Sequence, residues 1–112
     1  MAVTENTSGS TTTDGTEQTL ATITAAGNYQ FRIDLGNMVK ADAIEVRIKT
    51  EARSADATAY VLYFAAYANA QGADARIAET PWVAIPASSQ YIVTLKRTAG
   101  TDRAYAWSIL TQ

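Results

Sequence analysis

Carboxylates are the side chains in this sequence whose spacing could support catalysis. Asp42 precedes Glu45 by three residues, and Asp34 lies in a stretch that could approach Asp42 across strands. Two carboxylates placed in this way could form an acid–base couple of the glycosidase type. Asp34 and Glu45 alternate with apolar residues, however, and this pattern favours the solvated face of a strand over an active site.

The absence of two residue types removes most other catalytic chemistry. The chain has no His and no Cys, which excludes serine–histidine triads, cysteine nucleophiles and zinc sites built on thiolate or imidazole ligands. Its six glycines form no phosphate-binding loop, and no aspartate run has the spacing of a calcium loop. We therefore predict that the protein is not an enzyme and binds neither a cofactor nor a metal.

The overall charge points to protein partners. Nine basic and eleven acidic residues leave a net charge of −2, and neither sign forms a block. This balance predicts neither nucleic-acid binding nor attachment to an anionic membrane. No apolar run approaches the ~20 residues that cross a bilayer, and the first residues lack the basic and apolar regions of a signal peptide. We expect a soluble protein without a leader.

Three basic residues stand out against this mixed background. Lys96, Arg97 and Arg103 flank one predicted hairpin turn, and they have fewer acidic neighbours than the other basic residues. If any basic group meets an acidic partner surface, we expect it to be here.

The aromatic residues are more numerous than a core of this size needs. The chain has two Trp and six Tyr, and both types are enriched in protein interfaces and in sugar-binding platforms. Tyr63, Tyr67, Trp82 and Tyr91 lie on or beside segments with little charge. They either fill the core, contact another subunit or stack on carbohydrate, and we favour subunit contact over carbohydrate.

These aromatic residues centre on one charge-free segment. Residues 57–73 carry no charge, and their middle, Thr58–Tyr67, is aromatic and β-branched. Read as a strand, the segment has apolar residues on both faces. One face holds Tyr60, Leu62 and Phe64, and the other holds Val61, Tyr63 and Tyr67. Such a strand is either central in a packed sheet or covered on one side by another chain.

Period-two alternation predicts the remaining strands. The other clear strands are expected near residues 19–23, 29–35, 44–51, 91–96 and 104–110. Residues 73–80 are expected to form an irregular connection or a weak edge strand, and the Pro81 to Pro86 segment a short edge piece. The alanine-rich stretches also suit a helix, but the pattern as a whole predicts an all-β fold, a single small antiparallel β-sandwich or jelly roll.

The first 18 residues differ from the rest of the chain. They are rich in Thr, Ser and Gly, and their only bulky apolar side chains are Met1 and Val3, so they contribute little to a core. They form either a disordered terminus or an extended arm that adds a strand to a neighbouring subunit. We predict a flexible N-terminal arm over residues 1–18 and a sandwich domain over residues 19–112.

Three stretches carry a resemblance to a known class of proteins. Residues 15–35 (GTEQTLATITAAGNYQFRIDL), 43–50 (AIEVRIKT) and 94–110 (TLKRTAGTDRAYAWSIL) resemble small β-sandwich proteins encoded among the head genes of tailed bacteriophages, the capsid decoration or cement proteins. The resemblance rests on strand-and-turn patterns and covers most of the chain beyond residue 15. It implies a virion protein, made in the host cytoplasm, that clamps neighbouring major capsid proteins, often as a trimer at local threefold positions. No site residue is carried over from it.

The expected function is therefore structural. Such a protein would bind the assembled, expanded lattice and not the free subunits, so its binding energy would stabilise the shell. The residues predicted to contact partners are the arm, the exposed aromatics and the basic turn. They are Val3, Thr11, Thr12, Thr13, Glu17, Tyr63, Tyr67, Trp82, Lys96, Arg97 and Arg103. The alternatives are a carbohydrate-binding or adhesion module on the virion surface that uses Trp82, and a tail or connector subunit.

Overall fold

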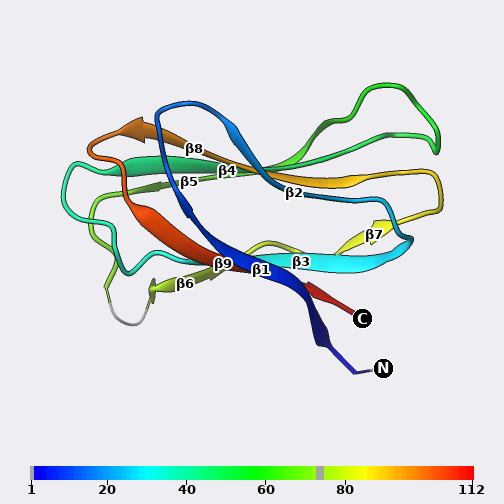
Figure 1. Cartoon of the computed structure of the whole chain (residues 1–112), viewed down its shortest axis with the longest axis horizontal. Coiled ribbons are helices and arrows are strands. Elements are labelled where there is room, and N and C mark those ends of the chain that lie inside the picture. Colours follow the sequence, from blue (N-terminus) through cyan, green and yellow to red (C-terminus); the bar gives the residue numbers. More distant parts are fainter. Residues whose placement is uncertain (1, 73–74) are drawn as a thin grey trace.

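The computed structural model describes residues 2–72 and 75–112. Over these residues the chain forms nine strands in two antiparallel sheets that pack face to face (Figure 1). The prediction of a small all-β sandwich is confirmed. Alternating side chains give each sheet one apolar face, and the two apolar faces are buried by packing against each other.

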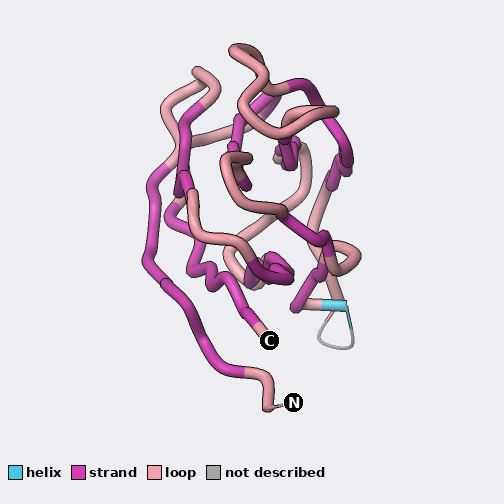
Figure 2. Tube along the Cα trace, turned by 90° about the vertical axis from the view of Figure 1, so that its right-hand side faces the viewer, coloured by secondary structure: helices cyan, strands magenta, loops and turns pink. Residues whose placement is uncertain are grey.

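Strand order places β5 and β1 at sheet edges. The first sheet runs β1 (Thr4–Thr12), β9 (Ala104–Thr111), β3 (Gly27–Asp34) and β6 (Ile77–Glu79), and β7 (Val83–Ile85) pairs with the other end of β3. The second sheet runs β2 (Gln18–Ile23), β8 (Tyr91–Ala99), β4 (Ala43–Thr50) and β5 (Tyr60–Ala68). Figure 2 shows the chain as a tube after a turn of 90°, with the strands in magenta.

The core consists of apolar residues that alternate along the strands, together with Met38 and Ile85. Phe31 of β3, Val46 of β4 and Val93 of β8 are buried between the sheets, while Arg32 on β3 points to solvent. The Phe31 ring lies 6.3 Å from the Trp107 ring, centroid to centroid. Fourteen buried apolar residues form the cluster. They are Tyr29, Phe31, Ile33, Leu35, Met38, Ile44, Val46, Ile48, Ile85, Tyr91, Val93, Leu95, Tyr105 and Ile109.

The charge-free segment is not a central strand. Its strand, β5, has a single strand partner, β4, and forms an edge of the second sheet. Of the two alternatives for a strand that is apolar on both faces, the first is therefore wrong. Tyr63 and Tyr67 turn inward and are half-buried against the core, while much of the rest of β5 remains exposed.

The N-terminal segment is extended, and it pairs with its own chain. Residues Thr4–Thr12 form β1, which lies antiparallel to β9, so the structure joins this segment to the sandwich; Met1 is outside the described residues. The Thr-rich composition suits a strand. Gly9 faces the Trp107 indole, and a Cβ on Gly9 would lie 3.0 Å from Trp107 Cζ2. The same indole donates a hydrogen bond from Nε1 to Thr11 Oγ1 at 3.1 Å.

Two short segments form the far edge of the first sheet. β6 and β7 are strands of three residues each. β6 falls within the predicted connection 73–80, of which residues 73 and 74 lie outside the description. β7 lies between the two prolines, as expected for an edge piece.

Candidate protein-interaction surface

The three carboxylates considered for an acid–base couple each bind a different partner. Asp34 accepts a hydrogen bond from Arg76 Nε at 2.7 Å, and Glu45 pairs with Arg47 at 2.9 Å. Asp42 is held by loop groups. Each carboxylate thus has its own partner. Among residues 2–72 and 75–112, no group of three or more acidic side chains is arranged to hold a metal ion.

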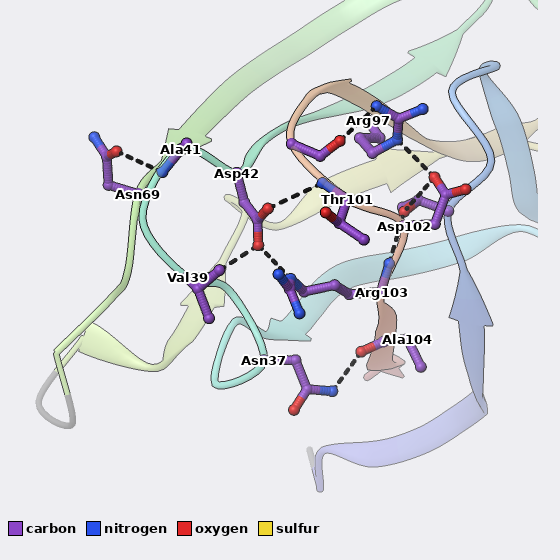
Figure 3. Close-up of polar contacts among 12 residues, drawn as sticks. Asn37, Val39, Ala41, Asp42, Asn69, Arg97, Thr101, Asp102, Arg103 and Ala104 are labelled. Carbon is purple, nitrogen blue, oxygen red and sulfur yellow. Dashed lines mark hydrogen bonds and ion pairs between the residues drawn. The ribbon is translucent and has the colours of Figure 1, made fainter.

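Asp42 organises the loops at one end of the sandwich (Figure 3). Its side chain is 3% exposed. The carboxylate accepts hydrogen bonds from the Val39 N–H at 2.9 Å and the Thr101 N–H at 3.2 Å, and it pairs with the Arg103 guanidinium. These donors, the Val39 N–H above all, lower the pKa of Asp42 below its ordinary value although burial opposes them. The network ties the β3–β4 loop to the β8–β9 loop.

Acid is expected to weaken the protein through this carboxylate. Because the pKa of Asp42 is lower in the folded state than in the unfolded state, its stabilising contribution is present above about pH 4 and is lost as the pH falls through the folded pKa. The urea concentration at the midpoint of unfolding, measured from pH 6 to pH 2.5, should decrease over this acid range. Asp42→Asn should be less stable than the wild type at pH 6 and should lose less on acidification. An equal decrease of the urea midpoint with pH in the wild type and in Asp42→Asn would contradict this role of the Asp42 carboxylate.

The basic turn is compensated within the chain. Arg97 Nε lies 2.6 Å from Asp102 Oδ1, and Arg103 pairs with Asp42. The prediction that these arginines have fewer acidic neighbours than the other basic residues is wrong, because Asp102 lies in the same turn as Arg97 and the fold brings the distant Asp42 to Arg103. Lys96 lies opposite Glu45 in the β4–β8 register. These ion pairs therefore hold the turn in place within the fold.

The predicted contact residues of the N-terminal segment divide into two groups. Thr11, Thr13 and Glu17 contact their own chain. Thr13 is buried and exchanges two hydrogen bonds with the Arg103 backbone in the β8–β9 loop, and Glu17 lies 2.6 Å from a lysine of β4, which lowers the pKa of Glu17. Val3 and Thr12 are exposed.

The aromatic residues considered as contact residues differ in how deeply they are buried. Tyr91 is fully buried, and Tyr63 and Tyr67 are half-buried against the core. Burial raises the pKa of the Tyr67 phenol. Trp82 is 37% exposed at the start of β7. The tyrosines chosen from the sequence thus mainly support the fold.

The exposed apolar side chains of β5 are different ones. Tyr60 is 70% exposed, Leu62 56% and Phe64 48%, and Val61 is similarly exposed. Their exposure follows from the edge position and from a break in register, because Tyr63 faces Ile48 and Val61 faces Lys49 while Leu62 has no partner on β4. Such a β-bulge bends the strand and changes the direction of its side chains.

A groove adjoins the bulged end of β5. It has a volume of about 460 Å³ and lies between the start of β5 and the β7 region of the other sheet. Tyr60, Val61 and Leu62 line one side, and Val83 and Pro86 line the other. We call these five residues the β5 groove. Its walls are largely apolar, and it opens at the side of the sandwich where β5 has no neighbouring strand.

Comparisons with known proteins assign no family to this chain. Its described residues contain no helix long and apolar enough to cross a bilayer. No family model, curated protein or solved structure matches the sequence or the fold closely enough to assign a family.

Proposed function

We propose that this protein is a non-enzymatic structural protein that binds other protein subunits through the β5 groove. The observation that carries the proposal is the cluster of exposed apolar side chains at Tyr60, Val61 and Leu62 beside apolar walls from the other sheet. Single exposed apolar residues are ordinary, but a contiguous group at a concave surface marks an interaction site.

The chemistry of the groove favours a protein partner over a sugar. A carbohydrate site needs several hydrogen-bond donors and acceptors around a flat ring. Thr50, Glu51, Ser54 and Ser89 also line the groove, but its lining is mainly apolar, and Trp82, the residue expected to stack on a sugar, is not part of it. A protruding apolar side chain of a partner would bury this surface more completely.

The specific form that we propose is decoration of a bacteriophage capsid. It is supported by the resemblance of residues 15–35, 43–50 and 94–110 to capsid decoration proteins. In this proposal the protein binds neighbouring major capsid proteins in the expanded lattice. Because it binds the assembled shell and not the free subunits, each bound copy stabilises the shell.

Binding to capsids is expected to depend on Leu62 and not on a matched residue elsewhere. Leu62→Asp places a charge in the groove, whereas Ile77→Asp makes a similar change on the other sheet at a side chain that is equally exposed, 55% against 56%. In co-sedimentation with expanded heads that lack the protein, the wild type should bind saturably. Leu62→Asp should weaken binding roughly 30-fold, and Ile77→Asp should leave it within about threefold.

Other outcomes point to the other candidate functions. Absence of wild-type binding to heads would overturn the capsid proposal. Binding to a glycan array that is lost in Trp82→Ala would identify a carbohydrate-binding module. Incorporation into tails or connector rings would identify a tail or connector subunit.

A further inference from the structure

β5 also presents an open strand edge that the groove does not use. Beyond the bulge, residues 63–68 form a regular strand without charge or proline, and β4 is their one strand partner within the described residues. The other edges are less suited to pairing. β1 is polar, β2 has a register break, and β6 and β7 have three residues each. A long apolar edge without protection is a template for another strand.

We propose that residues 63–67 pair with the same residues of a second copy of this chain, antiparallel and about a two-fold axis at Ala65. The pairing would join the four-stranded sheets of two copies into one sheet. Directly opposite residues in an antiparallel pair project to the same face. Tyr63, Ala65 and Tyr67 face inward, so the axis must pass through a single residue, and Phe64, Ala65 and Ala66 are the central choices.

Charges on β4 select among these three registers. Arg47 lies beside Phe64 and Glu45 beside Ala66 on the outer face. An axis at Phe64 would place the two copies of Arg47 in one row across the sheet, and an axis at Ala66 would do the same for Glu45. An axis at Ala65 instead gives a row of Arg47, Phe64, Ala66 of the second copy and Glu45 of the second copy. This register avoids rows with like charges at both ends, which lie about 14 Å apart across three strand spacings.

The side chains at this register also fit in size. Phe64 would lie over the small Ala66 of the second copy, which would cover a ring that is 48% exposed. The two copies of Ala65 would meet at the axis, where small residues allow close approach.

Arg47 leans toward the proposed dimer interface. Its Cζ lies 5.0 Å from the Phe64 ring centroid, with Nη2 bound to Glu45. Its Nη1 is buried without a hydrogen-bond partner in the described structure. Glu45 of the second copy, at the far end of the same row, would stabilise the positive charge of this guanidinium. The contact is one strand pair of about 20 Å, at the small end of specific interfaces, so we expect a dimer that forms reversibly with concentration.

Cysteine cross-linking tests the register directly, because the chain has no cysteine of its own. Opposite residues in such a pair lie within disulfide reach, whereas residues offset by two positions do not. Under mild oxidation Ala65→Cys should cross-link to itself. Phe64→Cys mixed with Ala66→Cys should cross-link faster than either alone. Ser8→Cys on β1 is the control and should stay uncoupled. Equal or faster cross-linking of Ser8→Cys would overturn the proposal.

Sedimentation equilibrium tests the association itself. The wild type should approach twice its chain mass of 12.0 kDa as concentration rises. Phe64→Glu removes the ring and adds a charge in the row that holds Glu45 of the second copy, so it should weaken association about 30-fold. Ile77→Glu on the other sheet should stay within about threefold of the wild type. A monomer at every concentration would overturn the pairing, and so would a trimer, which would fit the phage resemblance instead. Since Leu62→Asp tests capsid binding separately, either proposal can fail alone.

Discussion

Replacing Phe31 by alanine is expected to lower the free energy of unfolding by about 3–5 kcal/mol, the cost of removing a buried ring and leaving a cavity. Phe31 is 1% exposed at the centre of β3 and contacts Trp107. The other phenylalanine of the chain, Phe64, provides the matched control because it is 48% exposed. Phe64→Ala should cost less than about 1 kcal/mol in the monomer.

Urea unfolding followed by tryptophan fluorescence measures both changes. The protein concentration should be low enough to keep the chain monomeric, since Phe64 also lies in the proposed dimer interface. Losses that are small for both variants would mean that the first sheet does not bury Phe31 as described. Losses that are large for both would mean that β5 is covered in the monomer.

Replacing Gly100 by alanine is expected to lower the free energy of unfolding by roughly 2–4 kcal/mol. Gly100 has a φ of +85°, which disfavours any side chain, and an added Cβ would lie 2.7 Å from the Asp42 Cα and 3.0 Å from the Ala41 carbonyl oxygen. Neither atom is the end of a flexible side chain, so the β8–β9 loop would have to move. The hydrogen bond from Thr101 to Asp42 would be disturbed with it.

Gly72→Ala is the control for this loop. A Cβ on Gly72 would meet no atom within 4 Å, so the change should be nearly neutral. Thermal unfolding of the two variants provides the comparison. Gly100→Ala with wild-type stability would show that the loop adapts and that the Asp42 network does not depend on its present geometry.

Alternation predicts most of the core, and its failures have identifiable causes. In β3 the exposed Arg32 separates the buried Phe31 and Ile33, which could be read from the sequence, whereas Gln30 at an outward position is also buried and donates a hydrogen bond to the Thr80 carbonyl. In β5 both faces are apolar, and no polar residue marks the outward one. Tyr63 and Tyr67 were therefore chosen as contact residues, whereas Tyr60, Leu62 and Phe64 are more exposed. The bulge at Leu62 has no signal such as glycine in the local sequence.

Two further features depend on contacts between distant residues. The N-terminal segment has little apolar surface of its own, and its place in the fold depends on the open edge of β9 and the contact between Gly9 and Trp107. Arg103 meets Asp42, which lies 61 positions away. Sequence spacing could not reveal either contact, because each requires the loops and edges to be folded first.

The pairing of β1 with β9 has a consequence for how the protein could carry other molecules. Thr4 lies opposite Thr111, so the start of β1 and the end of β9 emerge at one corner of the sandwich (Figure 1). β1 and the adjoining β2 are edge strands on the side away from β5. That corner lies in the same row of paired residues as Val83 of the β5 groove, so a domain fused to either end would need a linker to leave the groove free. A short linker between the two ends could close the chain for circular permutation.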